Sequence, residues 1–575
     1  MARIAAAGAV RSFTGVRHQL VPKQSMLVRD EDLILAMEEM LLRAQENGMS
    51  LANVERLRTV VFMLDLWRLE LRPTDTANAP PYEPVLREDA RPRRARQRAF
   101  GPAQLEALEA EVSKLVEAGV LEPCSDSTWS SPCYVTPKPN DRGWRFIADA
   151  RWPNSQVVPL ALAGLPCHNG QRRALRGSRF FGLVDLLKAY FLFVMGELAQ
   201  RIYAVQTPRQ VYKFKRLPMG SVDAAAWTQK HVSEALAGTA SEAYLDDIVI
   251  HHETEDGYVD ALITVLRRLD ALNVKVDPRK AELFLRSIKW VGHLYDEHGV
   301  RPDPARIQGL RDLPPPETLA DLAQFYGAVQ YLREFLPRVS EALKPLEEFL
   351  EAGYAKLGSR KNSRAKTMRV RQHGWDETLD LAYDDVKALL SRAIGLAHLK
   401  QDTHQVVLMT DASDLAWGAV VAQVPVEQAD RNIEDMDLEP LAVLSGLFDS
   451  SQRGWAIHDK EAWPLVHVAK KHGDLLYGTH PFLYVGDSTV VCYIYNPERL
   501  VPVPRAAQID RVHRWAIWLS AHRYKTRHIS GESNNLPDLL SRWGRPQEDR
   551  DDGDAARTAC LLARVARVGA EASEA

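Results

Sequence analysis

The chain has 575 residues, which is enough for several domains rather than one hydrophobic core. Apolar residues make up 46% and charged residues 26%, as in soluble globular proteins, and no run of about 18 apolar residues predicts a membrane span. The net charge of −3 excludes a general attraction to nucleic acid, so polyanion binding must come from local basic patches. The five Cys are scattered and never at zinc-ligand spacing, which indicates a reduced, intracellular protein.

The first part of the chain predicts helices followed by an exposed connection. Residues 30–46 (DEDLILAMEEMLLRAQE) place apolar side chains at helical spacing, and Asn47-Gly48 ends that pattern before a second helix begins. The stretch 72–98 is rich in Pro and Arg and ends in RPRRARQR, which is typical of an exposed linker. We therefore expect residues 1–99 to form a helical N-terminal extension and a basic linker.

A second basic stretch lies at 356–372, KLGSRKNSRAKTMRVRQ, with seven Lys or Arg and no acidic residue. It is either a solvated linker or a segment that contacts phosphate groups, and the sequence leaves both interpretations open. Around it, residues 100–355 and 400–545 alternate helical patterns with short apolar runs, which predicts mixed α/β or α+β domains. Residues 547–575 are charged and Ala-rich and predict a disordered tail.

Two adjacent carboxylates, Asp246 and Asp247, stand in the stretch AYLDDIVIHH (243–252), before a β-branched run that predicts a buried strand. Like charges about 4 Å apart repel by about 4 kcal/mol at an effective dielectric of about 20, so a cation must offset them. That cation is a Lys, an Arg or a metal ion. An acidic hairpin turn is the plainer interpretation, but apolar residues on both sides favour a buried, metal-neutralised site.

A third carboxylate, Asp185, ends an apolar strand-like run in RFFGLVDLLKAYFLFVM (179–195), shortly before Tyr190. A strand that ends in a carboxylate can converge with a hairpin that carries two more. Oxygen ligands of this kind suit Mg²⁺. Two such ions about 3.5–4 Å apart can stabilise the attacking and leaving oxygens of phosphoryl transfer.

At these residues the sequence resembles the reverse transcriptase of Ty3/gypsy-type LTR retrotransposons. SSPCYVTPKPNDRGWRFIADARWPNS (130–155) resembles the fingers segment of that family, and QTPRQVYKFKRLPMG (206–220) resembles the segment leading to the nucleotide pocket. KWVGHLYDEHGVRPDPARI (289–307) resembles the primer-grip strand, and DLAQFYGAVQYLREFLPRVSEALKPL (321–346) resembles the thumb and connection. The order and spacing agree with the family throughout.

The resemblance implies a role for each matched residue. Three carboxylates would hold two Mg²⁺ ions, with Mn²⁺ as a possible substitute: Asp185, Asp246 and Asp247. Lys138 and Arg145 would neutralise the incoming deoxynucleoside triphosphate, and the ring of Tyr190 would lie under the sugar and exclude a 2′-hydroxyl. Gln229 is assigned to the nucleotide pocket. The primer grip is assigned to Trp290, Val291, Gly292 and His293.

Four further acids each lie at the start or end of a predicted element: Asp411, Glu461, Asp487 and Asp538. One such acid is explained by a helix cap or a turn, but four in this order resemble the ribonuclease H domain that follows reverse transcriptase in the same elements. The resemblance implies two more Mg²⁺ ions that activate water to cut the RNA strand of an RNA–DNA hybrid. His528 is either a mobile His beside that site or a structural residue.

The sequence thus predicts a multidomain α/β (α+β) protein, with a right-hand fingers–palm–thumb polymerase followed by an RNase H-like mixed sheet with helices. The expected boundaries are 100–298 for fingers and palm, 299–398 for thumb, connection and basic linker, and 399–546 for the RNase H-like domain. The predicted activity is RNA-directed DNA synthesis with hydrolysis of the RNA strand. The partners are an RNA template, a DNA primer, their hybrid and deoxynucleotides, with no membrane.

Two alternatives remain at this stage. The first is a catalytically inactive relic that binds nucleic acid, because Ala225, Thr228 and Ser488 depart from the family's Pro, Phe and His. Gly486 and Pro537 also replace a Thr and an Ala of the family pattern. The second is an RNA-dependent RNA polymerase, which would share the palm acids but not the RNase H block. The sequence leaves the oligomeric state open.

Overall fold

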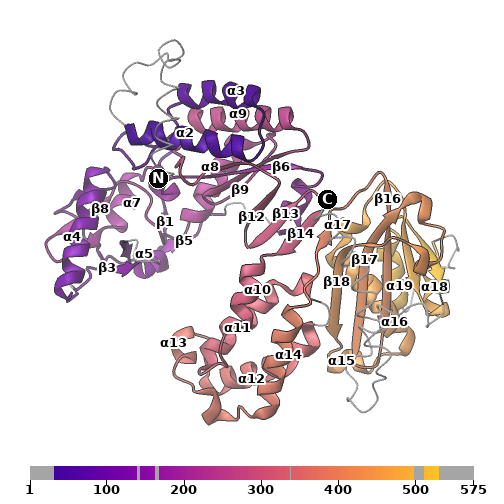
Figure 1. The fold of residues 1–575 in the computed structure, drawn as a ribbon. Helices are drawn as coiled ribbons and strands as arrows, with labels where there is room; N and C mark the ends of the chain where they lie inside the picture. The colour runs from indigo at the N-terminus through magenta and orange to yellow at the C-terminus, as the bar shows by residue number, and fades with distance from the viewer. Residues whose placement is uncertain are drawn as a thin grey trace. The chain divides into compact units, whose positions relative to one another are not determined.

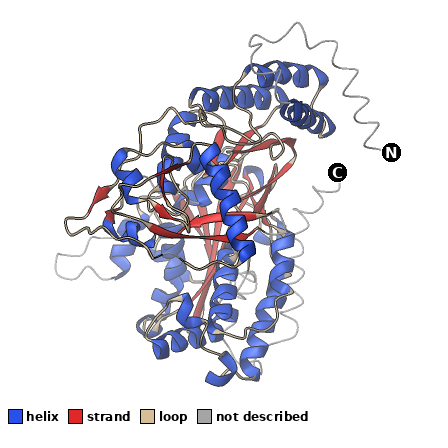
Figure 2. Cartoon of the chain, turned by 90° about the vertical axis from the view of Figure 1, so that its left-hand side faces the viewer, coloured by secondary structure: helices blue, strands red, loops and turns tan. Residues whose placement is uncertain are grey.

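The computed structural model describes residues 31–96, 98–138, 143–161, 168–336, 339–497 and 511–529. The chain forms two compact units that divide between Ile288 and Lys289. The domain boundaries expected from the sequence stay predictions. Both units combine sheets with helices (Figures 1 and 2), as the alternating sequence patterns predict. Within the described ranges, no helix is both long and apolar enough to span a bilayer. The predicted tail, 547–575, lies outside the described residues.

An antiparallel sheet of four strands organises the first unit, in the order β11-β6-β10-β9. Its strands are β6 (Phe180–Asp185), β9 (Ser241–Tyr244), β10 (Asp247–His252) and β11 (Glu282–Leu285). The apolar run at 248–250 is fully buried in β10, which confirms the strand predicted after the paired carboxylates. Two helices pack on this sheet, α8 (Ala224–Leu236) and α9 (Glu255–Ala271).

A second sheet of the first unit has the order β2-β8-β7-β3-β4. Its strands are β2 (Leu121–Pro123), β3 (Ser131–Pro137), β4 (Trp144–Ala148), β7 (Val205–Gln206) and β8 (Val211–Phe214). The short strands β1 (Val85–Leu86) and β5 (Val157–Val158) pair with each other. The connecting helices are α4 (Pro102–Glu117), α5 (Arg151–Gln156), α6 (His168–Ala174), the 3₁₀ helix η3 (Ala189–Leu192) and α7 (Glu197–Ile202).

The N-terminal helices α2 (Glu31–Glu46) and α3 (Leu51–Met63) belong to the core of the first unit. The Arg43 guanidinium donates to the carbonyls of Pro278 and Ala281 at 3.0 and 3.2 Å. Asn53, which is buried, donates to the carboxylate of Glu255 at 2.9 Å. The extension expected at the N-terminus therefore packs against α9 and β11, and Figure 1 shows α3 beside α9.

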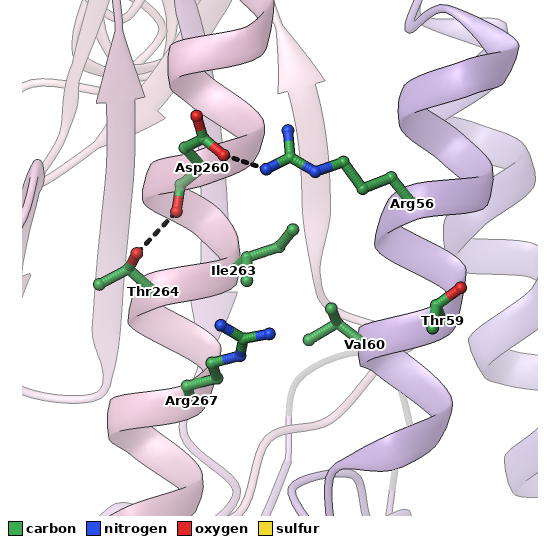
Figure 3. A pocket seen from close by; sticks show the side chains of 7 residues that line it. All are labelled: Arg56, Thr59, Val60, Asp260, Ile263, Thr264 and Arg267. Carbon is green, nitrogen blue, oxygen red and sulfur yellow. Dashed lines mark hydrogen bonds and ion pairs between the residues drawn. The ribbon is translucent and has the colours of Figure 1, made fainter.

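A pocket of about 480 Å³ lies between α3 and α9 (Figure 3). Val60 and Ile263 form its apolar floor, and both side chains are largely buried. An ion pair between Arg56 and Asp260 joins the two helices across it. Arg267 lines the pocket from α9. The ion pair and the apolar contacts together fasten α3 to the first unit.

The second unit begins with a small sheet in the order β12-β13-β14-β15. Its strands are β12 (Ser287–Trp290), β13 (His293–Asp296), β14 (Gly299–Pro302) and β15 (Leu396–Ala397). A helical bundle with its own apolar core follows β14. Its helices are α10 (Pro304–Arg311), α11 (Leu319–Tyr331), η4 (Arg333–Phe335), α12 (Val339–Leu357), α13 (Asn362–Ala365), η5 (Val370–His373) and α14 (Glu377–Leu390).

The last part of the second unit is a mixed sheet in the order β18-β17-β16-β19-β20. Its strands are β16 (His404–Ala412), β17 (Ala416–Pro425), β18 (Glu439–Leu447), β19 (Phe482–Gly486) and β20 (Tyr524–His528). Strands β16 to β18 are antiparallel, whereas β19 runs parallel to both β16 and β20. The associated helices are η6 (Val426–Gln428), η7 (Ile433–Asp435), α15 (Ser450–Arg453), α16 (Ile457–Lys471), α17 (Gly473–Leu476), α18 (Thr489–Ile494) and α19 (Arg511–Leu519).

The packing of α3 into the core predicts a large effect of truncation there. Leu57 is 0% exposed, so Leu57→Ala should lower the free energy of unfolding of the first unit by about 2–5 kcal/mol. Leu51→Ala on the same helix is the matched control, because Leu51 is 61% exposed and its loss should cost less than about 0.5 kcal/mol. Urea unfolding of both proteins measures the difference. Equal stability of the two variants would mean that α3 is not part of the cooperative core.

Candidate active sites

The first site is built at the junction of β6 and β10. Asp185, the last residue of β6, lies directly opposite Asp247, the first residue of β10. The backbone N–H of Leu186 donates to the carbonyl of Asp246 at 2.8 Å, which holds the tip of the β9–β10 hairpin against the end of β6. The structure therefore brings together the three carboxylates predicted to act as one site. Asp185 and Asp247 are partly buried and Asp246 is exposed.

The hairpin tip is a two-residue turn, because Tyr244 pairs with Asp247 across it. Leu245 in this turn has φ of 59°, a left-handed conformation that a branched side chain rarely adopts. Two-residue hairpin turns require positive φ, so the tight connection itself imposes this conformation. Strain of this kind persists only where neighbouring contacts hold the backbone in place.

Gln229 on α8 supplies those contacts. Its side chain is 4% exposed, and its Oε1 accepts a hydrogen bond from the backbone N–H of Leu245 at 2.8 Å. Its Nε2 donates to the carbonyl of Ala243 and to Ser233 Oγ, both at 2.9 Å. Gln229 was assigned to nucleotide binding from the sequence, and that assignment stays a prediction. In the structure this side chain fixes the hairpin that carries Asp246 and Asp247.

Negative charge is crowded at this junction. Burial raises the pKa of Asp247 to about 6, and the charges of Asp246 and Asp185 act in the same direction. Burial also raises the pKa of Asp185, against the opposing effect of Lys280. The Lys280 Nζ lies 2.8 Å from Asp185 Oδ1, so Lys280 is one cation that offsets the repulsion. Sequence reasoning missed it, because a single Lys in the turn at 278–280 gives no signal of its own.

The ligand atoms available at this site are of the kind that a hard divalent cation prefers. All three side chains offer carboxylate oxygens, which are the ligands that Mg²⁺ prefers. Lys280 neutralises Asp185 in part, yet the pKa of Asp247 remains raised. Among the described residues, no three His, Cys, Asp or Glu side chains are gathered closely enough to hold a metal ion as they lie. The role of these carboxylates as metal ligands stays a prediction.

Besides Gln229, the residues assigned to nucleotide binding lie on the β3–β4 hairpin and on η3. Lys138 closes the β3–β4 hairpin through its backbone N–H, which donates to the carbonyl of Gly143 at 2.7 Å, and its side chain is partly exposed. Arg145 is exposed on β4, opposite Thr136. Tyr190 lies on η3, where burial and the charge of Asp246 raise its pKa. Tyr190 is therefore near the carboxylates. The contacts of all three with a nucleotide stay predictions.

The segment assigned to the primer grip forms the turn between β12 and β13. Val291 and Gly292 both have positive φ, at 45° and 74°, as a two-residue hairpin turn requires. Trp290 and His293 flank the turn but are 1% and 0% exposed, so their side chains belong to the core. The Tyr331 hydroxyl on α11 donates to the carbonyl of Val291 and fixes the turn. A primer contact at this segment, which stays a prediction, would involve the turn rather than the two flanking side chains.

The second site lies at the ends of parallel strands. Met409 of β16 pairs with Val485 of β19, and the same register places Asp411 and Asp487, two residues further on, at matching positions. Glu461 lies in the first part of α16, which packs on β16 and β17. The carboxyl ends of neighbouring parallel strands meet at one edge of a sheet, so Asp411 and Asp487 share one end of the domain. Asp538 lies outside the described residues.

Tyr484 connects the acids of the second site to the core. Its hydroxyl is buried and hydrogen-bonds with Thr410 Oγ1 at 3.1 Å. Burial raises the pKa of Tyr484 well above its usual value, and the nearby charges of Asp487 and Glu461 act in the same direction. A Cβ at position 486 would lie 2.9 Å from this hydroxyl, which explains why Gly stands there.

Two further positions near the second site have structural contacts. Ser488 caps α18 by accepting a hydrogen bond from the backbone N–H of Val491 at 3.3 Å. The Nε2 of His528, on the exposed last residue of β20, lies 3.0 Å from the carbonyl oxygen of Asp487. This contact holds β20 beside the loop that carries Asp487. The mobile catalytic role considered for His528 stays a prediction.

Two segments of the chain match models of known families. Residues 136–295 match the reverse transcriptase (RNA-dependent DNA polymerase) family. Residues 401–522 match the RNase H-like domain found in reverse transcriptase. The first segment contains the three acids of the first site, and the second contains Asp411, Glu461 and Asp487. The chain therefore carries a reverse transcriptase domain followed by an RNase H-like domain, which confirms the order predicted from the motifs.

Similar curated proteins are polyproteins of Ty3/gypsy-type transposons. The retrovirus-related Pol polyprotein from transposon opus of Drosophila melanogaster is 25% identical over 444 residues, which cover 76% of this chain and 42% of that protein. The transposon Tf2-3 polyprotein of Schizosaccharomyces pombe is 26% identical over 448 residues, which cover 77% of this chain and 31% of that protein. The matched part thus spans less than half the length of either relative.

A solved structure of the foamy viral protease–reverse transcriptase in complex with an RNA/DNA hybrid has the same fold. Its TM-score is 0.68 at 19% identity, and the match covers 90% of this chain and 65% of that chain. This likeness confirms the predicted fold class, a fingers–palm–thumb polymerase followed by an RNase H-like domain. The assignment of the β11-β6-β10-β9 sheet to the palm and of the helical bundle after β14 to the thumb stays a prediction.

The raised pKa of Asp247 predicts that removal of its charge stabilises the first unit at neutral pH. Folding raises the pKa of this acid above the value of about 3.9 that it has in the unfolded chain. Such an acid destabilises the folded state progressively as the pH rises from the unfolded pKa through the folded pKa. The pKa of Asp247 in the folded state is about 6. The change in unfolding free energy caused by Asp247→Asn should therefore be more stabilising at pH 7.5 than at pH 4, by about 1–3 kcal/mol. Denaturant unfolding in EDTA at both pH values measures this gain.

The control for this prediction is Asp89→Asn, since Asp89 is an exposed acid of the same unit. As a substitution of an exposed side chain, it should change the free energy of unfolding by less than about 0.5 kcal/mol. If Asp247→Asn changed the free energy of unfolding equally at pH 4 and pH 7.5, the charge of Asp247 would not be destabilising at the junction of β6 and β10.

The contacts of Gln229 predict that it stabilises the hairpin. Gln229→Leu keeps the side-chain volume but leaves the Leu245 N–H without its partner, at a cost of about 1–3 kcal/mol. Hydrogen exchange at the Leu245 amide should become faster, while exchange in β16 stays unchanged. Glu234→Leu on the exposed face of α8 is the matched control. Unchanged exchange at Leu245 would show that the hairpin does not depend on Gln229.

Proposed function

We propose that this chain, a reverse transcriptase and RNase H segment related to Ty3/gypsy-type transposon polyproteins, copies RNA into DNA and hydrolyses the RNA strand of the hybrid. The observation that carries the proposal is the register of β6 and β10, which sets Asp185 opposite Asp247 at the tip of a strained hairpin. A second set of acids at the ends of β16 and β19 supports the hydrolytic step. Both sets lie inside the segments that match the corresponding families.

The substrates follow from the chemistry of the two domains. A reverse transcriptase domain requires an RNA template, a primer end and deoxynucleoside triphosphates, and its product is the hybrid that RNase H cleaves. The foamy viral relative was solved with an RNA/DNA hybrid, which supports the same kind of ligand for this chain. We therefore assign the template, the DNA primer and the hybrid as its nucleic-acid partners.

In the polymerase site, the carboxylates would hold Mg²⁺ or Mn²⁺, and a bound pair of ions supplies the charge that activates the 3′-hydroxyl and stabilises the leaving pyrophosphate. Asp247, with a pKa of about 6, is ionised at neutral pH and available as a ligand. Lys138 and Arg145 would bind the triphosphate, Arg145 through a bidentate fork. The ring of Tyr190 would bound the pocket on the sugar side and exclude a 2′-hydroxyl.

In the RNase H site, Asp411, Glu461 and Asp487 would hold the metal ions, and Asp538 would complete the set. The role of this part of the chain is to bring the acids to one end of the sheet and to orient the scissile phosphate there. Tyr484 keeps the ends of β16 and β19 together through its hydrogen bond with Thr410. Because this site lies in a separate domain, we expect it to work independently of the polymerase site.

This independence predicts that the two activities can be removed separately. Asp246→Asn should abolish extension of a DNA primer on an RNA template and leave cleavage of a preformed hybrid intact. Asp487→Asn should do the reverse, because each substitution removes a metal ligand from one site only. Gel assays with Mg²⁺ and deoxynucleotides measure both activities in each protein, and EDTA should abolish both.

The inactive relic is tested by the same assays. A folded wild-type chain that neither extends several primers nor cleaves hybrid, with Mg²⁺ or Mn²⁺, would support the relic and exclude the proposed activity. Retention of both activities in either variant would mean that the acids are assigned to the wrong roles. Incorporation of ribonucleotides in place of deoxynucleotides would favour an RNA-dependent RNA polymerase.

A further inference from the structure

The segment 66–82, which we call the strap, follows the N-terminal helices and is largely folded into the first unit. The sequence predicts an exposed linker from residue 72 on, yet Asp75, Ala77 and Tyr82 are 1%, 6% and 0% exposed. The prediction is wrong for these residues, because contacts with distant parts of the chain cover them. Buried backbone groups need hydrogen-bond partners, so the partners of the strap show what it holds in place.

The first part of the strap lies beside the strand that adjoins the polymerase acids. The backbone N–H of Arg68 donates to the carbonyl of Val276 at 3.0 Å, and the N–H of Val276 donates to the carbonyl of Leu66 at 3.0 Å. Val276 also forms an antiparallel bridge with Leu186, the residue after Asp185. The strap is therefore one extended segment away from the end of β6.

The middle of the strap contacts η3, the 3₁₀ helix that carries Tyr190. The N–H of Ala77 donates to the carbonyl of Leu192, the last residue of η3, at 2.7 Å. Lys188, which precedes η3, has φ of 50°, in the left-handed region that residues other than glycine rarely adopt. Such a backbone persists only where surrounding contacts hold it, so η3 depends on its neighbours for its position.

The Arg216 side chain joins the strap to η3. It is 2% exposed and lies between the turn at 72–75 of the strap and η3. Its guanidinium donates four hydrogen bonds to backbone carbonyls: Arg72 at 2.9 Å, Pro73 at 2.8 Å, Asp75 at 2.9 Å and Phe191 at 3.1 Å. A guanidinium is planar and presents its donors in a fixed fork, so these bonds set the position of η3 relative to the turn.

A buried ion pair fixes the turn that Arg216 binds. The Nε of Arg68 lies 3.2 Å from both carboxylate oxygens of Asp75, and both side chains are buried. The backbone N–H of Arg72 donates to Asp75 Oδ2 at 2.9 Å. Because the backbone of Arg68 is bonded to Val276, the ion pair connects the turn to the strand beside the polymerase acids.

We propose that the strap positions η3 through Arg216 and thereby sets how strictly the polymerase site excludes ribonucleotides. The ring of Tyr190 would exclude a 2′-hydroxyl, so a displacement of η3 changes the room left for the sugar. Arg216 is a positioning residue in this arrangement, because its bonds go to backbone carbonyls of the strap and of η3. The effect on sugar choice rests on the proposed function; the attachment of η3 to the strap does not.

The test measures sugar discrimination in the full chain. Primer extension on an RNA template gives kcat/KM for a deoxynucleotide and for the matching ribonucleotide, and the amount of folded protein cancels in their ratio. Arg216→Lys keeps the charge, but an ammonium has three donors and cannot make all four bonds. A misplacement of about 1 Å can change a rate by about 10²-fold, so this partial loosening should lower the ratio by about tenfold.

Two matched controls should keep the wild-type ratio. Arg268→Lys makes the same exchange at a guanidinium that donates to the carbonyls of Ala235 and Ala237, at the end of α8. Leu41→Ala removes a fully buried side chain from α2 and destabilises the same unit. An unchanged ratio in Arg216→Lys would overturn the proposal. An equal fall in Leu41→Ala would also overturn it, because general loosening of the unit would then explain the effect.

A double-mutant cycle tests whether Arg216 acts through Tyr190. Tyr190→Ala should lower the ratio, and Arg216→Lys added to it should lower the ratio no further, because the residue that Arg216 positions is gone. Full additivity of the two effects would contradict the proposal.

A second variant tests the strap if Arg216→Lys does not fold. Pro73 is exposed, and Pro73→Gly loosens the turn while it keeps the carbonyl that Arg216 binds. This variant should lower the ratio in the same direction by a smaller factor. A wild-type ratio in a folded Pro73→Gly protein would count against the strap.

Hydrogen exchange separates failure of this proposal from failure of the proposed function. The amides of Phe191 and Phe193, which donate to the carbonyls of Lys188 and Tyr190, should exchange faster in Arg216→Lys and at the wild-type rate in Arg268→Lys. If the wild type never extends a primer, the proposed function fails, and faster exchange in η3 still supports its attachment to the strap. Unchanged exchange in η3 would overturn that attachment whatever the activity.

Discussion

The antiparallel register of β6 and β10 is the constraint on which the polymerase site depends. It sets two carboxylates opposite each other, and residues paired in this way have Cα atoms about 4.5–5.5 Å apart. Paired residues project their side chains from the same face of the sheet, so the two negative charges repel each other. The arrangement persists because the apolar run in β10 is fully buried and cannot slip without exposing its side chains. Packing therefore keeps the charges together, and Lys280 reduces their repulsion without removing it.

The RNase H-like domain reaches a similar result through parallel strands. There the acids follow β16 and β19 at matching positions, and a buried tyrosine rather than a strained turn holds the two ends together. The departure at Gly486 is understandable in this light, since a side chain at that position would meet the hydroxyl of Tyr484. Ser488, another departure, has a helix-capping contact of its own. Both residues fit this fold, so neither departure by itself indicates a decayed domain.

The sequence was sufficient to place Asp185, Asp411 and Asp487 at or just after the ends of strands, because each one comes at the end of a largely apolar run and such runs form strands. It was insufficient for Gln229 and Lys280, whose contacts join residues far apart in the chain and have no local pattern. The N-terminal helices were predicted, but their fusion with the core was not. That fusion depends on polar contacts such as Arg43 to the carbonyl of Pro278, which amphipathic spacing does not reveal. Asp538 lies outside the described residues, so its place in the second site remains a prediction.

The charge of the chain is nearly balanced in total but unevenly distributed along the sequence. Acids gather where metal ions and reacting phosphates would be held, and the stretch 356–372 of the helical bundle after β14 carries seven Lys or Arg and no acid. Neighbouring residues of opposite charge can neutralise a charged side chain, as they do for three arginines of this stretch: Arg360, Arg369 and Arg371. A polyanionic ligand that carries its own cations resolves both imbalances at once, because its phosphates complement the bases and its metal ions complement the acids. This distribution of charge therefore favours a nucleic-acid ligand, and the argument does not depend on any single catalytic residue.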